Sequence, residues 1–330
     1  MSNIDLETFL DVKFILHHIK FGVLLLFQII AIVLSLIILA YFIKHKSFVK
    51  NPQNHGILIL IAVNFIQLVF DMPNALAFYS RDYIYPNTSN YCTWWTFFAY
   101  SIFAISGYLL ATISIQRHFF IFNIHILRTG WNRIFLHYFP LVLCIFYPIV
   151  FYLFAIVFYP CDGTQWDFTN NLCGFAPCYL LFNKVLGTFD IAVNNYMPVV
   201  IDFISNVIII LRVVKQKRHA QRSTAWKQQR HMTIQLLSLS IIYLIAWTPC
   251  LTVLAVQMLH DPTFLLTIQT DYFLDLIYII YLFIPWACIG FIPGVMKWIK
   301  GLILQQPFQN TIVPIPTNNV RDNTKPRNGI

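Results

Sequence analysis

Long apolar runs alternate along the chain with short polar segments. A run of about 20 apolar residues is long enough to cross roughly 30 Å of hydrocarbon as an α-helix. The sequence contains seven such runs, at approximately residues 20–43, 56–79, 94–120, 134–159, 190–214, 232–259 and 270–293. We therefore predict an all-α membrane protein, a bundle of seven transmembrane helices.

Two further segments follow the seventh apolar run, an amphipathic stretch and then a polar tail. In the stretch GVMKWIKGLILQQ, apolar residues recur at helical spacing opposite two lysines, Lys297 and Lys300. The apolar residues are Val295, Trp298, Ile299, Leu302 and Ile303. This pattern predicts a short amphipathic helix on the inner membrane surface. Residues 305–330 are polar and rich in Pro and Asn, and we expect a disordered tail. Residues 20–304 would then form one membrane domain, preceded by an N-terminal segment of residues 1–19.

Prolines interrupt five of the predicted membrane helices. They are Pro73, Pro148, Pro198, Pro249 and Pro285. Each removes a backbone hydrogen bond and bends its helix, which hydrocarbon tolerates only where neighbouring groups satisfy the freed carbonyl. Bent helices in this number predict a bundle that opens on one side and can pivot, as in a receptor or a transporter.

Composition and charge agree with a membrane location and indicate an orientation. The chain is 58% hydrophobic and only 11% charged, which is far too apolar for a soluble protein of 330 residues. Four alternate segments hold 18 of the 22 Lys and Arg residues and one acid, Asp322: residues 44–55, 117–133, 212–231 and 294–330. Basic loops remain cytoplasmic, so these segments are predicted inside. The segments 1–19, 80–93, 160–189 and 260–275 carry most of the loop carboxylates and are predicted outside, with the N-terminus. The net charge of +9 reports this orientation and gives no support to nucleic-acid binding.

Cysteine positions fit the same orientation. Cys92, Cys161, Cys173 and Cys178 lie in predicted outside loops, where disulfides persist, and the other cysteines lie within helices. A zinc site is the alternative for the outer four. No histidine accompanies them at ligand spacing, so we expect no metal and no cofactor. The sequon NTS at Asn87 permits glycosylation in the same outer region.

The stretch ATISIQRHFFIF, residues 111–122, places Arg117 within an apolar run. From Cys92 to Arg117 there are 25 residues, which span about 38 Å at the helical rise. Because Cys92 lies at the outer end of its helix, Arg117 lies at the inner end. There it either anchors the helix by reaching the lipid headgroups or serves a function at the inner surface.

Three short motifs occur in an order, spacing and topology that resemble the rhodopsin-like family of G-protein-coupled receptors. They are IQRH at residues 115–118, NYMPVV at 195–200 and AWTPC at 246–250. The resemblance covers residues 20 to about 304. It implies that Arg117 is the coupling arginine of the third helix, and that Trp247, Pro249 and the seventh-helix Pro285 form the activation switch. It also implies a disulfide between Cys92 and Cys178, which leaves Cys161 and Cys173 to pair with each other.

The chain departs from the family's pattern at several inner positions. Gln116 replaces the acid beside the arginine, Asn64 the second-helix aspartate, Ser35 the first-helix asparagine, Asn206 the fifth-helix tyrosine, and Ile284 and Cys288 the seventh-helix asparagine and tyrosine. In the family, the second-helix aspartate holds an internal sodium ion. A neutral amide at Asn64 should not, so we expect no sodium site. Without an acid at Gln116, we also expect a weakly restrained resting state.

The resemblance narrows the ligand mostly by exclusion. Ala99 stands where amine receptors carry an aspartate, and Tyr278 stands where opsins carry their lysine. Helical spacing gives a candidate ligand-binding set in the outer half: Asp71, Asn74, Tyr100, Phe103, Asn195, Trp247, Gln257, Asp275 and Tyr278. Ordinary packing between helices explains each aromatic residue equally well. Asp71 is more telling, because an ionisable group inside a membrane helix needs a cation, a polar network or water. Asp202 raises the same question, although a protonated state or packing between helices would also explain it.

We therefore expect a plasma-membrane receptor that binds an extracellular ligand and activates a heterotrimeric G protein. Helix six would pivot about Pro249 and open an inner cleft around Arg117. Basic residues would border the cleft, although attraction to anionic lipid explains each of them as well: Arg212, Lys215, Lys217, Arg218, Arg222, Lys227 and Arg230. The acidic outer face favours a cationic peptide. The alternative is a transporter or channel, which should show inverted repeats or a chain of membrane carboxylates beyond Asp71 and Asp202. No catalytic motif indicates an enzyme.

Overall fold

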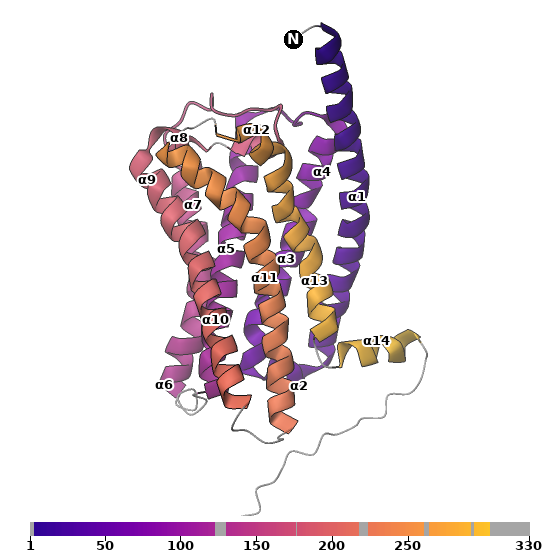
Figure 1. Ribbon diagram of the computed structural model, residues 1–330, viewed down its shortest axis with the longest axis vertical. Helices are drawn as coiled ribbons and strands as arrows, with labels where there is room; N and C mark the ends of the chain where they lie inside the picture. Colours follow the sequence, from indigo (N-terminus) through magenta and orange to yellow (C-terminus); the bar gives the residue numbers. More distant parts are fainter. Residues whose placement is uncertain are drawn as a thin grey trace, which may run out of the picture.

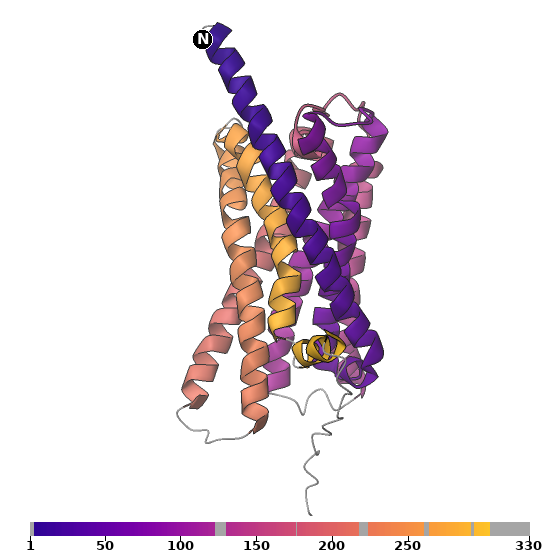
Figure 2. The same cartoon turned by 90° about the vertical axis from the view of Figure 1, so that its right-hand side faces the viewer.

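Seven long apolar helices stand side by side in the computed structural model, which describes residues 3–122, 130–175, 177–217, 224–260, 264–291 and 294–303 (Figures 1 and 2). The candidate membrane spans are Val12–Lys44, Pro52–Arg81, Ser89–Phe120, Gly130–Val157, Lys184–Arg212, Leu237–Gln257 and Leu266–Ile289. Every predicted apolar run falls on one of them, and the described residues contain no strand. The predicted seven-helix membrane fold is confirmed.

Three spans are continuous helices, and four are built from consecutive helical segments. The continuous ones are α1 (Asn3–Lys44), α5 (Ser89–Phe122) and α11 (Thr224–Leu259). The second span joins α3 (Pro52–Phe70) to α4 (Met72–Arg81). The fourth joins α6 (Gly130–Arg133), the π-helix η2 (Ile134–Tyr138), α7 (Phe139–Tyr152) and η3 (Leu153–Val157). The fifth joins α9 (Lys184–Phe189), η5 (Asp190–Tyr196) and α10 (Met197–Lys217), and the seventh joins α12 (Leu266–Ile268), η6 (Gln269–Phe273) and α13 (Leu274–Phe291).

The first helix is longer than predicted. α1 begins at Asn3, well before the apolar run at residue 20, and projects beyond the end of the bundle that is predicted to face outside, called the outer end below (Figure 1). No glycine or proline occurs in this segment before Gly22, so nothing in the backbone chemistry ends the helix. Hydrophobicity marks only the part of a helix that lies in lipid.

Two of the five predicted prolines lie at junctions between helical segments. α3 ends at Phe70, Asp71 forms the junction, and α4 begins just before Pro73. Pro198 follows the π-helix η5 at the start of α10. The other three lie inside helices: Pro148 in α7, Pro249 in α11 and Pro285 in α13. The upper part of α11 turns away from its lower part (Figure 1).

The third span, α5, is the centre of the bundle. Of its most apolar window, 78% is buried inside the protein, against 28% for α1, which lies at the edge. Close packing against the second span depends on Gly56 of α3. A Cβ atom on Gly56 would lie 2.5 Å from Cγ1 of Ile113, a distance that real side chains do not reach. The absence of a side chain at Gly56 therefore sets how closely the two helices approach.

A short helix, α14 (Val295–Ile303), follows α13 at the inner end, as its amphipathic pattern predicts, and runs sideways past the end of α1 and away from the bundle (Figures 1 and 2). Val295 and Trp298 are buried, and the Trp298 ring lies 5.7 Å from Tyr41 of α1. The apolar face thus packs partly on the bundle itself, and not only on the membrane surface as predicted. The tail predicted to be disordered, residues 305–330, lies outside the described residues.

Candidate functional site

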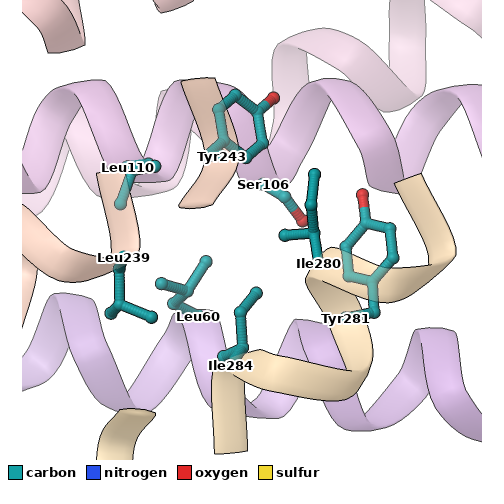
Figure 3. A pocket seen from close by; sticks show the side chains of 8 residues that line it. All are labelled: Leu60, Ser106, Leu110, Leu239, Tyr243, Ile280, Tyr281 and Ile284. Atoms are coloured by element: carbon teal, nitrogen blue, oxygen red, sulfur yellow. The ribbon is translucent and has the colours of Figure 1, made fainter. Parts of the chain in front are cut away.

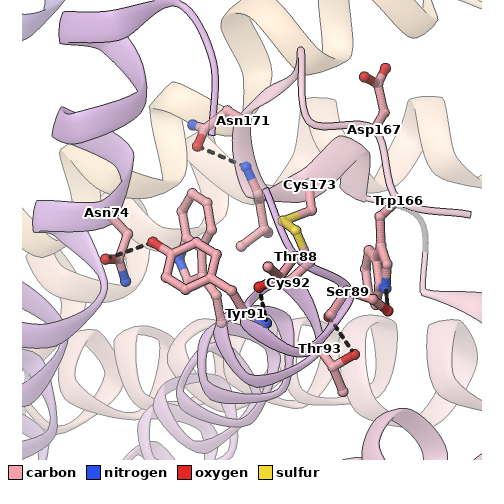
Figure 4. Close-up of a disulfide and its surroundings, with 12 residues drawn as sticks. Asn74, Thr88, Ser89, Tyr91, Cys92, Thr93, Trp166, Asp167, Asn171 and Cys173 are labelled. Atoms are coloured by element: carbon pink, nitrogen blue, oxygen red, sulfur yellow. Dashed lines mark hydrogen bonds between the residues drawn. A yellow bond between two sulfur atoms is a disulfide. The ribbon is translucent and has the colours of Figure 1, made fainter. Parts of the chain in front are cut away.

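The outer end of the bundle is covered by the loop between the fourth and fifth spans. A disulfide joins Cys92, at the start of α5, to Cys173 in η4 (Asn171–Phe175) (Figure 4). The neighbouring Leu172 is buried and has φ of 52°, a left-handed conformation that turns the loop back on itself. The amide of Ile84 donates to the carbonyl of Phe168 at 2.9 Å, so a second outer loop is tied to the first.

The predicted pairing of Cys92 with Cys178 is wrong. Cys178 begins α8 (Cys178–Phe182) and pairs with Cys161, with the two Cα atoms 6.4 Å apart. Cys173 and Cys178, the two candidate partners of Cys92, both precede the fifth span, and only four residues lie between them. The resemblance favoured Cys178 because it lies 20 residues before Pro198, and such a spacing cannot resolve so small a difference. The left-handed turn at Leu172 brings Cys173 over α5 instead.

Two exposed carboxylates of this loop remain ionised. Hydrogen bonds from the Thr164 hydroxyl and amide hold the pKa of Asp162 below its ordinary value. Partial burial opposes the same shift at Asp167, but hydrogen bonds from Thr169 and Asn170 outweigh it and lower the pKa of that group also. These two groups therefore carry negative charge on the loop at physiological pH.

Asp71 is fully buried at the junction of α3 and α4. Its carboxylate accepts hydrogen bonds from the indole nitrogen of Trp95 at 2.7 Å and from the amide nitrogen of Gln67 at 2.9 Å. One turn further out, Asn74 accepts a hydrogen bond from the Tyr91 hydroxyl at 3.1 Å (Figure 4). Asp71 thus belongs to a polar network, one of the environments that the sequence argument required.

Asp275 has a cationic partner that sequence reasoning missed. Lys20 of α1 forms an ion pair with it at 2.7 Å, and the Tyr79 hydroxyl donates to the other carboxylate oxygen. Asn171 of the outer loop donates to the Tyr79 oxygen at 3.2 Å. The ammonium group of Lys20 also lies 5.0 Å from the centre of the Tyr272 ring. The only sequence signal was a single lysine at the start of the first apolar run and a pair of acids at the start of the seventh.

Aromatic rings fill the middle of the bundle. Phe103 stacks on Tyr281 at 5.8 Å and meets the edge of Trp247 at 6.0 Å. Directly below lies a small cavity lined by Leu60, Ser106, Leu110, Leu239, Tyr243, Ile280, Tyr281 and Ile284 (Figure 3). Its free volume is about 10 Å³ for the centre of a water molecule, which is room for one water. The hydroxyls of Ser106 and Tyr281 line it and have no hydrogen-bond partner in the described part of the chain.

A second buried carboxylate, Asp190, was not predicted. It accepts hydrogen bonds from the hydroxyls of Tyr152 and Tyr179, each at 2.8 Å, and from the amide of Asn194 at 2.7 Å. Burial raises the pKa of Tyr179 well above its usual value, which keeps that hydroxyl protonated as a donor. Asp190 stands at the predicted edge of an apolar run, where the sequence does not distinguish a loop carboxylate from a buried one.

The remaining predicted ligand-binding residues do not form one group. Tyr100 is buried against Tyr152, with ring centres 5.6 Å apart, and Tyr278 is buried in α13. Asn195 donates to the backbone carbonyl of Asp190. Gln257 donates to the side chain of Gln269 at 2.7 Å. The predicted set is thus divided among several networks within the outer half of the bundle.

At the inner end, Arg117 is 3% exposed, deep between the helices. One terminal nitrogen of its guanidinium group has no hydrogen-bond partner among the described residues, and no ion pair is present for it there. Asp202 of α10 accepts hydrogen bonds through one carboxylate oxygen from Ser114, Ser240 and Asn206, so a polar network holds it. Arg230 lies in α11, but its side chain is outside the described residues.

Comparison with protein families decides the identity. The sequence model of the 7 transmembrane receptor (rhodopsin family) matches residues 34–289, which is more than half of the chain. The chain belongs to the rhodopsin family of seven-transmembrane receptors. A search of curated proteins finds no significant match. As a family member, the receptor is a multi-pass membrane protein, and such receptors take a ligand and a G protein as partners and are generally not enzymes.

The receptor's departures from the family pattern lie in the core. Asn64, in place of the second-helix aspartate, is 1% exposed, and neither side-chain amide atom has a hydrogen-bond partner in the part of the chain described. Gln116, in place of the acid beside Arg117, turns towards the fourth span, where it donates to the backbone carbonyls of Leu136 and His137 at 3.2 and 3.0 Å. Gln116 therefore joins the third span to the fourth.

Proposed function

We propose that this receptor binds an extracellular ligand of cationic character and activates a heterotrimeric G protein through Arg117. The observation that carries the proposal is the family match together with the position of Arg117. A buried arginine at the inner end of the central helix, without an ion-pair partner in the described chain, is available to a partner that enters between the helices. The fork of its guanidinium group suits backbone carbonyls at a helix end.

The proposed motion is a pivot of α11 about Pro249. Trp247 lies two residues before Pro249 in α11, and its ring contacts Phe103 of the central helix. A ligand that displaces this ring in the outer half would therefore move α11 next to its hinge. The indole nitrogen of Trp247 has no hydrogen-bond partner among the described residues, which leaves the ring held by packing alone. Packing contacts of this kind can rearrange without breaking a polar network.

The proposed orientation places the N-terminus outside the plasma membrane and the C-terminal segment in the cytoplasm. Eighteen of the 22 basic residues support it, because they occupy alternate segments on one side. An epitope tag after Ser2 should stain intact cells, and a tag at Ile330 should stain only permeabilised cells. Surface staining of the C-terminal tag would contradict the proposed orientation.

The ligand is proposed to be a cationic peptide because the exposed loop carboxylates Asp162 and Asp167 stay ionised. The buried acids contribute less than the sequence suggested, since Lys20 already neutralises Asp275. We expect cationic peptides to activate a chimeric G-protein reporter, with potency falling at high ionic strength. Replacing Asp162 and Asp167 together by Asn should weaken the active peptides, while Thr164→Val, which keeps both charges, should change potency less. Equal potency on the Asn variant would exclude the loop carboxylates as the attraction.

A further inference from the structure

Two histidines meet at the inner end of the bundle. His55 lies near the start of α3 and His137 in η2, and Nδ1 of His55 is 3.1 Å from Nε2 of His137. The outward nitrogen of each ring faces an oxygen. Nε2 of His55 is 2.7 Å from the backbone carbonyl of Val49, and Nδ1 of His137 is 3.1 Å from the side-chain oxygen of Gln116.

The orientation of Gln116 is set by the chain around it. Pro140, at the start of α7, has no N–H to donate to the carbonyl of Leu136, four residues before it. The amide nitrogen of Gln116 donates to that carbonyl and to the next one. A flipped amide would place its oxygen against two carbonyl oxygens, so the Gln116 oxygen must face His137.

The three contacts made by the ring nitrogens of His55 and His137 need more N–H hydrogens than two neutral imidazole rings supply. A carbonyl oxygen can only accept, so His55 Nε2 and His137 Nδ1 each carry a hydrogen. The contact between the two rings needs a third hydrogen. A neutral imidazole carries one, and two carry only two. Without an added proton, two lone pairs would face each other at 3.1 Å.

We infer that His55 and His137 form a proton-binding site that holds one shared proton and joins the second and fourth spans beside Arg117. The site does not bind a second added proton, because Nδ1 of His55 and Nε2 of His137 would then both carry a hydrogen and point these hydrogens at each other. The site is filled at intermediate pH and weakened at both extremes. Through Gln116, it connects the Val49 segment of α2 (Lys46–Val49) to the helix turn that carries Arg117.

Neighbouring groups make the proton releasable. Arg133, one turn before His137, opposes the added charge, and no carboxylate acts on His137 within the described chain. The rings of Phe120 and Tyr138 pack against His137 at 5.5 and 4.8 Å. His137 is buried, whereas His55 is partly exposed, so protons exchange through His55. The shared proton is held between two carbonyl acceptors, the backbone oxygen of Val49 and the side-chain oxygen of Gln116.

The test is a double-mutant cycle followed across pH. His55→Phe and His137→Phe keep a ring but remove its nitrogens. Melting temperatures of the purified full-length receptor in nanodiscs, for wild type, both single variants and the double variant, give the coupling between the two sites at each pH from 5 to 9. We expect a coupling of about 2–4 °C at intermediate pH that falls towards zero at both ends. His118→Phe combined with His55→Phe is the matched control and should show no such peak, because His118 of α5 faces the backbone carbonyl of Ser205 on α10 and not the histidine pair.

Two results would overturn the inference. A coupling that is constant across the pH range would make the contact simple ring packing. A coupling that EDTA removes would show a metal ion between the facing nitrogens instead of a proton. Because the readout is stability, neither result depends on whether the receptor's ligand or G protein is as proposed.

Discussion

Cys173→Ser should destabilise the receptor more than Cys161→Ser does. The Cys92–Cys173 bridge closes a sequence separation of 81 residues, and the Cys161–Cys178 bridge closes one of 17. The loop-entropy model gives roughly 4.5 kcal/mol for the first and about 3 kcal/mol for the second. Cys173→Ser also frees Leu172 from its place over the bundle, which adds lost packing. Thermal unfolding of the purified variants in nanodiscs measures the order.

Peptide mapping under non-reducing conditions is the companion measurement. In the wild type it should recover Cys92 linked to Cys173 and Cys161 linked to Cys178. A peptide that joins Cys92 to Cys178 would show that the outer loop follows a different path. Equal destabilisation by the two serine variants would count against the longer bridge as the main constraint on the unfolded chain.

Arg117→Lys should reduce stimulated G-protein turnover by about 10- to 150-fold at matched surface levels. Lysine keeps the charge and can still reach lipid headgroups, so a simple anchor would be unaffected. It cannot reproduce the planar fork, and each hydrogen bond to a charged group contributes roughly 1.5–3 kcal/mol. Turnover in cells, normalised to surface expression of each variant, separates the two roles. Arg133→Lys is the matched control, since Arg133 is exposed at the same end of the bundle.

Hydrophobicity alone was sufficient to predict the seven spans and their order, because the bilayer requires about 20 apolar residues in each crossing. It could not predict the outer extension of α1, since residues 3–19 contain charged groups and lie beyond the apolar run. Nor could it predict how a span is divided. The π-helices η2 and η5 carry no distinct sequence pattern, although each precedes a proline, Pro140 or Pro198, in the first turn of the next helix.

The hydrogen-bond and ion-pair partners of the buried polar residues were harder to predict than the locations of those residues in the sequence. Asp71 and Asp202 stand out in the sequence as charges within apolar runs, and both lie in polar networks. The partner of Asp275 could not be found in the same way, because Lys20 is 255 residues away in the chain. Gln116 was interpreted from what it lacks, a carboxylate for Arg117. Its observed role depends on the carbonyl freed by Pro140, which only the packing of α5 against the fourth span reveals.

The central claim is that Arg117 couples this receptor to a G protein, and GDP release from purified heterotrimers tests it most directly. Wild-type receptor in nanodiscs should accelerate release when an active cationic peptide is present, and should show measurable acceleration without it if the resting state is weakly restrained. Arg117→Lys should lose at least tenfold of the stimulated rate, while Arg133→Lys retains it. An Arg117→Lys receptor that releases GDP at the wild-type rate would contradict the account and return Arg117 to the role of a membrane anchor.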